Sequence, residues 1–273
     1  MPVIPIDHLD DPRLAPYRAL KATNLTRWSG RFIAEGRKVV ERLVNSSYPT
    51  ESLLVSTRQL HYLPDLTDHP ELPVYAISPD QAEQLLGFQF HAGILGCGIR
   101  NHRATLDDLL TPVVPRRVIV AADRLTDPEN LGTLIRLCTG FGVSGLLLGP
   151  GCADPFSRRS LRVSMGNLLR LPVRESADLL CDLRELRSRG LPAVATVLDP
   201  RAIPLPEFQP PAGCVLLLGN ESAGLSAEIV AESEHLVTIP MHNETDSLNV
   251  AIAAAITLYA LTSPPVGNPL SFA

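Results

Sequence analysis

Three short stretches in the second half of the chain combine polar side chains that can bind an anion or orient a hydroxyl group with glycines that leave room for a ligand. They are residues 123–136 (DRLTDPENLGTLIR), 216–226 (LLLGNESAGLS) and 239–250 (IPMHNETDSLNV). Each stretch begins at or directly after a run of apolar residues typical of a buried strand. Ligands of open parallel sheets bind at the carboxyl ends of the strands, so a site is expected in these stretches.

The first stretch predicts a helix that presents a single arginine. Asp127 and Pro128 are typical of a helix start, because Asp accepts hydrogen bonds from free N–H groups and proline is tolerated at the first helical position. At 3.6 residues per turn, one face of this helix is apolar and the other carries Glu129, Gly132, Arg136 and Gly140. A guanidinium between glycines can bind a phosphate. The alternative is that Arg136 pairs with an acid and the glycines allow close helix packing.

The second and third stretches place small polar residues where a strand passes into a helix. Gly219 directly after its strand would let a ligand approach the main chain, and Gly224 permits the turn back toward a helix from Ser226. An ordinary turn between strand and helix is the alternative. Ser247 and Asn249 open an apolar helix whose free N–H groups can face a ligand. Ser247 as a plain N-cap would explain the serine and leave Asn249 without a role.

The hydrophobic pattern predicts the elements that hold these stretches. From Val118 onward, apolar strands alternate with helices, and strands are expected at 118–122, 145–148, 193–196, 214–218 and 235–239. Helices are expected from Pro128, after Pro155, near 177–189, from Ser226 and from Ser247, and 200–211 is a proline-rich loop. Strands that are uniformly apolar indicate a parallel sheet covered on both faces.

The first hundred residues predict a smaller α/β domain with short strands near 32–34, 53–55, 74–76 and 93–97. A polar stretch follows between Arg100 and Arg117, and its prolines at 112 and 115 are typical of a linker. The chain is therefore expected to contain a domain at residues 1–100, a linker at 101–116 and a second domain at 117–273.

The formal net charge of −5 gives the chain no general attraction to nucleic acid, so any RNA contact must be local. One local patch exists between residues 13 and 42, where the only acids are Glu35 and Glu41. Its cations are Arg13, Arg18, Lys21, Arg27, Arg31, Arg37, Lys38 and Arg42. The patch is either an RNA surface or the solvated face of one or two helices, and composition alone does not separate these alternatives.

Cysteine usage and apolar runs exclude several classes of protein. The 5 cysteines include no CxxC pair and have no histidine at metal-ligand spacing, so neither a disulfide framework nor a metal site is expected. The start MPVIPIDHLDDPRL lacks the basic and then apolar pattern of a secretory signal. The longest apolar stretch, 250–261, is shorter than the roughly 20 residues that cross a bilayer. We expect a cytoplasmic protein without a membrane segment.

Taken together and in order, the three stretches resemble the signature motifs of the SpoU (TrmH-like) branch of the SPOUT methyltransferases. The matching fragments are NLGTLIR, LGNESAG and IPM followed by SLNV, and LRVSMGNLLRLPV at 161–173 resembles the connector of the family. The resemblance covers residues 118–262. The segments FIAEGRKVVERLV and HAGILGCG are similar to the accessory substrate-binding domain of many members, which is related in fold to a ribosomal RNA-binding protein.

The resemblance implies an α/β fold with a trefoil knot in the C-terminal domain and a smaller N-terminal α/β RNA-binding domain. It implies an enzyme that methylates the 2'-hydroxyl of a ribose in RNA with S-adenosylmethionine. The cofactor would lie in the knot against Thr196, Leu218, Gly219, Ile239, Met241 and Leu248. The basic patch becomes an expected RNA surface, represented by Arg27, Arg31, Arg37 and Lys38. No GxGxG follows the first strand of the parallel sheet, which disfavours an ordinary Rossmann-type methyltransferase.

The family pattern also assigns the chemistry. It gives Arg136 the role at the target ribose, with the site shaped by Asn130, Glu221, Ser247 and Asn249. Arginine is a poor base because its pKa exceeds about 12, so we expect Arg136 chiefly to anchor a phosphate and polarise the hydroxyl. His242 is a candidate proton acceptor, although an exposed surface residue without a role in the reaction is the favoured interpretation. Asn243 replaces a glycine that is common in this loop, and asparagine tolerates a left-handed backbone better than most residues.

A homodimer is expected as well. The family places the cofactor site at a subunit interface, and the predicted closing helix, 247–261, is apolar on too many sides for a surface helix. Burial within one subunit is the alternative.

Two other functions stay open at this stage. One is a non-catalytic RNA-binding protein of the same fold, and the other is a knotted methyltransferase that acts on a base. Large-subunit rRNA is the favoured substrate over tRNA, because of the accessory domain.

Overall fold

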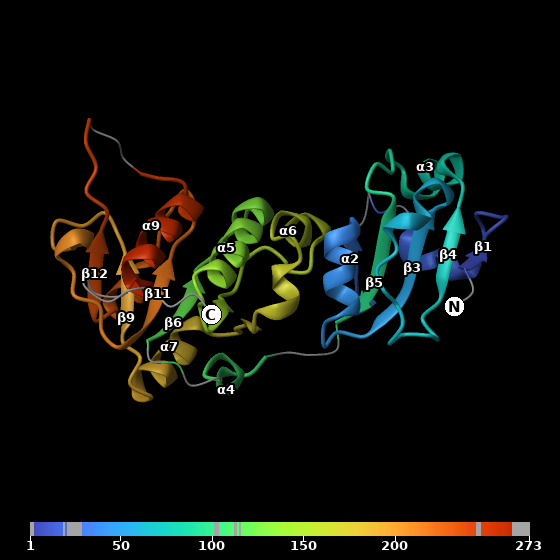
Figure 1. Ribbon diagram of the computed structural model, residues 1–273. Helices are drawn as coiled ribbons and strands as arrows, with labels where there is room; N and C mark the ends of the chain where they lie inside the picture. The colour runs from blue at the N-terminus through green and yellow to red at the C-terminus, as the bar shows by residue number, and fades with distance from the viewer. Residues whose placement is uncertain are drawn as a thin grey trace. The chain divides into compact units, whose positions relative to one another are not determined.

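The computed structural model describes residues 3–18, 20, 29–100, 104–111, 114, 116–243 and 247–263. By contact density the chain divides into two units, and each is described by itself. The first unit is Met1–His102 with Asp154–Arg170, and the second is Arg103–Ala153 with Leu171–Ala273. Both contain helices and a β-sheet, so both belong to the α/β class that the sequence predicts (Figure 1).

The first unit is built on a five-stranded sheet with the order β1-β4-β3-β5-β2. β1, β4 and β3 are parallel, and β5 runs antiparallel to both β3 and β2. Its strands are β1 (Val3–Pro5), β2 (Arg31–Glu35), β3 (Thr50–Ser56), β4 (Val74–Ile77) and β5 (Ile94–Ile99). Its helical elements are η1 (Pro12–Tyr17), α2 (Arg37–Val44), η2 (Thr57–Tyr62), α3 (Pro79–Leu86), α6 (Arg158–Val163) and η3 (Asn167–Arg170).

Helices α2 and α3 cover opposite faces of this sheet (Figure 1). On the α3 face, Leu85 and Leu86 share a buried cluster with Ile33 and Leu54. On the α2 face, Gly96 lies so close to Leu43 that an added Cβ would stand 3.0 Å from its Cδ2. The four strands expected in this part of the chain are confirmed, and β1 is an addition that three residues were too few to predict.

The second unit is built on a seven-stranded sheet with the order β10-β12-β9-β11-β6-β7-β8, and all its pairs are parallel. Its strands are β6 (Arg117–Ala122), β7 (Gly145–Leu148), β8 (Val173–Glu175), β9 (Ala193–Thr196), β10 (Ile203–Pro204), β11 (Gly213–Leu218) and β12 (His235–Thr238). Its helical elements are α4 (Leu106–Leu109), α5 (Pro128–Gly140), α7 (Leu179–Ser188), η4 (Leu205–Glu207), α8 (Ala227–Ala231) and α9 (Val250–Thr262).

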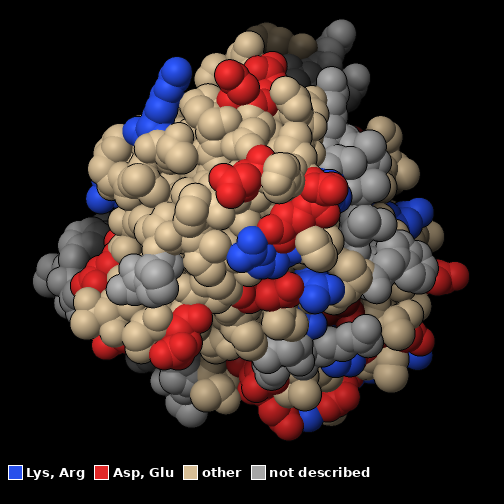
Figure 2. Space-filling view, turned by 90° about the vertical axis from the view of Figure 1, so that its right-hand side faces the viewer, with Lys and Arg blue, Asp and Glu red and all other residues tan. Residues whose placement is uncertain are grey.

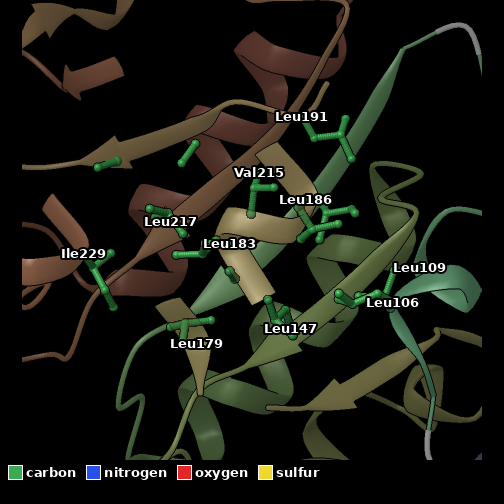
Figure 3. Close-up of a cluster of buried hydrophobic side chains, with 14 residues drawn as sticks. Leu106, Leu109, Leu147, Leu179, Leu183, Leu186, Leu191, Val215, Leu217 and Ile229 are labelled. Atoms are coloured by element: carbon green, nitrogen blue, oxygen red, sulfur yellow. The ribbon is translucent and has the colours of Figure 1, made fainter. Parts of the chain in front are cut away.

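The parallel sheet is buried on both faces, as predicted. Figure 3 shows Leu179, Leu183 and Leu186 of α7 beside Leu147 and Val215 of the strands, in one buried cluster. The strand residues that point the other way are buried too, namely Val118, Val120, Leu146, Val194 and Leu216. Apolar side chains on both sides explain why these strands lack polar alternation.

The structure differs from the predicted domain division in two places. Helix α4 lies inside the predicted linker, and its Leu106 and Leu109 belong to the core of the second unit. Residues 154–170, expected within the second domain, belong to the first unit. Their contacts with the first unit are with residues more than fifty positions away, which no local pattern reveals. The domain boundaries and the knot stay predictions.

Candidate active site

The three motif stretches meet at one edge of the parallel sheet. They follow β6, β11 and β12, and β9 lies between β11 and β12 in the strand order. Because all these strands are parallel, their carboxyl ends lie on the same side of the sheet. The loops after Ala122, Thr196, Leu218 and Thr238 are therefore neighbours, as the sequence predicts.

Helix α5 begins as expected in the first stretch. The Asp127 side chain accepts a 2.8 Å hydrogen bond from the backbone N–H of Glu129, and Pro128 occupies the first turn. Leu131, Leu134 and Ile135 on the inner face are fully buried. On the opposite face Glu129, Arg136 and Gly140 are exposed, whereas Gly132 is buried, contrary to the open space expected beside the arginine.

Glu221 of the second stretch accepts hydrogen bonds from the start of the first. The backbone N–H groups of Thr126 and Asp127 donate to its carboxylate at 3.4 and 3.2 Å, and Asn130 Nδ2 donates to Oε1 at 3.1 Å. Burial by itself would raise the pKa of Glu221, but the hydrogen bonds from Asn130 and from backbone N–H groups outweigh it and lower the pKa. Glu221 is therefore an ionised acceptor that joins two motif loops.

Asn249 connects the third stretch to the same group. Its Nδ2 donates to Asn130 Oδ1 at 3.0 Å, and its Oδ1 accepts from the backbone N–H of Ala251 at 2.9 Å. The backbone N–H at one end and the carboxylate at the other fix the orientation of both amides. Asn249, Asn130 and Glu221 thus form one hydrogen-bonded chain, which we call the motif chain, across all three stretches.

This arrangement corrects the prediction for the closing helix. The helix begins at Val250 rather than Ser247, and its N-cap is Asn249. Asn249 is therefore the cap itself, whereas a cap at Ser247 would have left Asn249 without a role. Ser247 is exposed and makes no hydrogen bond with another residue in the described ranges.

Arg136 follows Asn130 of the motif chain by six residues along α5, about 9 Å at 1.5 Å per residue. Its side chain is exposed. Within the part of the chain that the structure describes, no carboxylate pairs with it. The alternative in which Arg136 merely pairs with an acid has no support among these residues.

The turn of the second stretch explains both of its glycines. Gly224 has φ +66°, which permits the predicted turn toward α8. A Cβ on Gly219 would stand 2.2 Å from the backbone carbon of Gly224. The group that approaches Gly219 from that side is thus the protein's own backbone, where the sequence suggested a ligand.

Two residues that hold this turn had no predicted role, Asn220 within it and Asp123 directly after β6. Asn220 exchanges two 3.0 Å backbone hydrogen bonds with Gly224, and its Nδ2 donates to the carbonyl of Arg124 at 2.8 Å. The buried Asp123 accepts from the backbone N–H of Ser226 at 3.0 Å. Asn directly after a strand and glycine is a turn signal that could have identified Asn220.

The predicted cofactor residues lie at three neighbouring strand ends. Leu218 is buried, while Thr196, Ile239, Met241 and Leu248 are partly exposed. The Thr196 hydroxyl donates to the carbonyl of Leu217 at 2.9 Å, so its methyl group is left for a ligand. Aliphatic groups beside peptide groups at a sheet edge fit an adenosine, whose base needs an apolar slot with main-chain partners.

The described part of the loop after β12 contains the left-handed backbone expected at Asn243. Asn243 has φ +56°, which confirms that asparagine can replace glycine there. His242 is exposed and has no hydrogen-bond partner within the described ranges, in agreement with the favoured interpretation as a surface residue.

The structure separates the predicted RNA-binding residues. Arg31 pairs with Glu51 at 2.5 Å at the start of β2. Arg37 and Lys38 are exposed in the first turn of α2, after the end of the same strand. Arg27 lies outside the described residues.

The described residues contain no group of three or more potential metal ligands. None of their helices has the length and apolar character needed to span a membrane.

Comparison with known proteins supplies the family. The model of the SpoU rRNA methylase family matches residues 117–259. A Mycobacterium tuberculosis protein named uncharacterized tRNA/rRNA methyltransferase is 34% identical over 93% of this chain and 89% of its own length. The 23S rRNA (guanosine-2'-O-)-methyltransferase RlmB of Acinetobacter baylyi is 26% identical over 74% of this chain and 83% of its own.

Comparison with solved structures leads to the same family. The AdoMet-bound rRNA methyltransferase from Sinorhizobium meliloti matches with a TM-score of 0.80 and 28% identity, covering 95% of this chain and 97% of that one. The predicted fold class and family are confirmed. This chain belongs to the SpoU rRNA methylase family.

Proposed function

We propose that this protein transfers the methyl group of S-adenosylmethionine to the 2'-hydroxyl of a ribose in structured RNA, and that it acts in the cytoplasm on large-subunit rRNA rather than tRNA. The observation that carries the proposal is the motif chain of Asn130, Glu221 and Asn249, together with the exposed Arg136 further along α5. The name of the Acinetobacter relative specifies 2'-O-methylation of 23S rRNA, and that of the Sinorhizobium structure specifies bound AdoMet.

The cofactor supplies an electrophilic methyl group on its sulfonium. Thr196, Leu218, Gly219, Ile239, Met241 and Leu248 would hold it at the ends of β9, β11 and β12. Because these strand ends adjoin the loop that carries Glu221, the bound cofactor would lie next to the motif chain.

The residues around the motif chain would orient the substrate. A ribose hydroxyl is a weak nucleophile, so transfer depends on holding its oxygen in line with the methyl group. Arg136, without a carboxylate partner in the described ranges, would bind the target phosphate in a bidentate way and polarise the hydroxyl. Asn130, Glu221 and Asn249 would fix the starts of α5 and α9, and Ser247 would line the ribose pocket.

A homodimer is part of the proposal. Helix α9 buries Ala251, Ala254, Thr257, Leu258 and Leu261 within its own unit. Its other side carries Ile252, Ile256 and Tyr259, which are 53%, 40% and 66% exposed. Their spacing of four and three residues places them on one helical face. An apolar stripe of this kind is typical of a subunit interface.

The test is methylation of RNA from cells that lack the protein. Purified protein and methyl-labelled S-adenosylmethionine are incubated with unmodified rRNA and, in parallel, with tRNA, and the products are digested to nucleosides. We expect a labelled 2'-O-methylnucleoside from large-subunit rRNA. A labelled base would favour the base methyltransferase, and RNA binding without transfer would favour the non-catalytic alternative. A monomer at micromolar concentration in light scattering would contradict the dimer.

A further inference from the structure

A segment of the methyltransferase half of the sequence is folded into the first unit. Arg42 of α2 donates from Nη1 to the carbonyl of Met165 at 2.6 Å and to Asn167 Oδ1 at 2.7 Å. Arg100 pairs with Asp154 at 3.2 Å, and the two side chains are only 13% and 4% exposed. The segment 154–170 is therefore anchored at both ends to the residues of the first unit.

Aromatic packing fixes the start of helix α6 in the same way. The ring of Phe156 lies 5.1 Å from that of Phe32 on β2 and 5.4 Å from that of Tyr48. Rigid ring contacts of this kind hold neighbouring backbone in place. Helix α6, which begins two residues after Phe156, thus has a defined position beside β2.

At the end of β2, two arginines of α6 share one carboxylate. Arg158 Nε and Arg162 Nη1 lie 3.5 and 3.8 Å from the carboxylate oxygens of Glu35, whose side chain is 10% exposed. Arg158 also covers the ring of Phe88 at 4.2 Å. One negative charge compensates only one of the two cations, and Arg162 is 47% exposed. A positive charge therefore remains at the surface of α6.

The start of α2 adds further positive charge at the same place. Arg37 and Lys38 follow Glu35 by two and three residues, so their Cα atoms lie within about 8 and 11 Å of its Cα. Both are exposed in the first turn of α2, which has no acid and no side-chain cap. Cations here oppose the helix dipole. The space beside the N-cap, Gly36, is open, because a Cβ there would meet nothing within 4 Å.

We propose that the first turn of α2 and the exposed side of α6 form one surface that binds the phosphate backbone of RNA, which we call the α2/α6 surface. Arg37, Lys38 and Arg162 are its cations, and Arg158 compensates Glu35. The inference rests on the proposed function for its ligand class. Contacts with phosphates position a protein on RNA but carry no sequence information. The α2/α6 surface would therefore supply affinity for the RNA and fix its position, while the second unit would select the nucleotide to be methylated.

Among the described residues, the β1 end of the first unit does not offer this pattern. The end that carries β1 has acidic and basic side chains interspersed over the face shown in Figure 2. Arg13 pairs with Asp11, and Arg31 with Glu51. Because these cations are paired with carboxylates, they produce only a weak electrostatic field to attract a polyanion.

Binding of unmodified large-subunit rRNA to the full-length protein, measured over a range of salt concentrations, tests the surface. Each phosphate contact contributes about 0.9 to the slope of log K against log salt, or about eightfold in affinity at 0.1 M salt. We expect Lys38→Gln and Arg162→Gln each to weaken binding about eightfold and to reduce the slope by about 0.9. Arg162→Lys should retain binding. The kcat at saturating RNA should be unchanged, as should binding of S-adenosylmethionine.

A matched pair of substitutions that add positive charge tests whether RNA affinity depends on where the charge lies. Glu41→Lys adds positive charge on α2, whereas Glu83→Lys adds the same charge on α3, on the opposite face of the sheet. We expect only Glu41→Lys to tighten binding. Equal tightening by both, or unchanged binding by Lys38→Gln and Arg162→Gln, would overturn the inference. Absence of methyl transfer by a wild-type protein whose RNA binding follows this pattern would contradict the proposed function alone.

Discussion

Two glutamates in different units reverse the usual relation between burial and hydrogen bonding. Glu221 is exposed, yet it accepts from two backbone N–H groups and from Asn130. Glu35 is nearly buried, yet its Oε2 has no hydrogen-bond partner among the described residues. Its two oxygens face guanidinium groups instead, with Oε2 3.5 Å from Arg158 and Oε1 3.8 Å from Arg162. Proteins normally satisfy buried polar groups and leave exposed ones to water.

The difference shows what each region is built to do. The donors around Glu221 are neutral and directional, so they fix the positions of two loops relative to each other. The partners of Glu35 are cations at long distances, which add charge but little geometric constraint. The motif loops of the second unit are therefore suited to orient reacting groups, and the α2/α6 surface is suited to attract a polyanion.

The largest effect should come from removing Arg136, because it would break the assignment of chemistry to the motif loops. We expect Arg136→Ala to lower the rate of methyl transfer at saturating RNA by about 100-fold, as loss of a charged group at a reacting oxygen does in other enzymes. RNA affinity should change far less. Arg136→Lys should recover only part of the rate, and full recovery would contradict a bidentate role. Single-turnover kinetics with labelled cofactor measure both.

The next effect concerns the rigidity of the motif turn. In Gly219→Ala the new Cβ would stand 2.2 Å from the backbone of Gly224, so the turn that positions Glu221 must move. We expect a loss of about tenfold or more in affinity for S-adenosylmethionine by calorimetry. Gly140→Ala is the matched control, because its Cβ would meet nothing and alanine favours a helix by roughly 1 kcal/mol. Equal affinities in the two variants would mean that the turn does not need its present shape.

Substitutions of Asn249 can separate its role as the N-cap of α9 from its role in the motif chain. In Asn249→Asp, one oxygen can still cap α9, while the other would face Asn130 Oδ1; turning the Asn130 amide would only move the conflict to Glu221. We expect an unchanged Tm and a rate of transfer lowered about tenfold. Asn249→Ala should also cost about 1 kcal/mol of stability. If the Asp variant were fully active, the hydrogen bond to Asn130 would be only structural.

The smallest effect is a pH dependence of stability. Hydrogen bonds hold the pKa of Glu221 below 4.5, so its contribution to stability is present above pH 4.5 and is lost as the pH falls through the lowered value. We expect the difference in Tm between the wild type and Glu221→Gln to be constant near neutral pH and to shrink below 4.5. Glu228→Gln, at an exposed glutamate of α8, is the control. A difference that persists in acid would show that the charge of Glu221 is not what these donors stabilise.

Much of this protein is determined by the sequence alone. Uniformly apolar strands predict the parallel sheet, Asp127 and Pro128 predict the start of α5, and the order of the three motifs predicts the family. These features depend on local periodicity, on capping and on short fixed spacings, all of which are legible along one chain.

Only the tertiary structure shows which polar groups are partners. Asn130 and Asn249 are 119 positions apart, and Arg42 and Asn167 are 125 apart. No spacing rule connects such residues, since the sheet order brings the first pair together and the return of 154–170 to the first unit brings the second. The same holds for Gly219, whose lack of a side chain serves the protein's own backbone. Whether a residue faces a ligand or its own chain is decided by packing between distant segments.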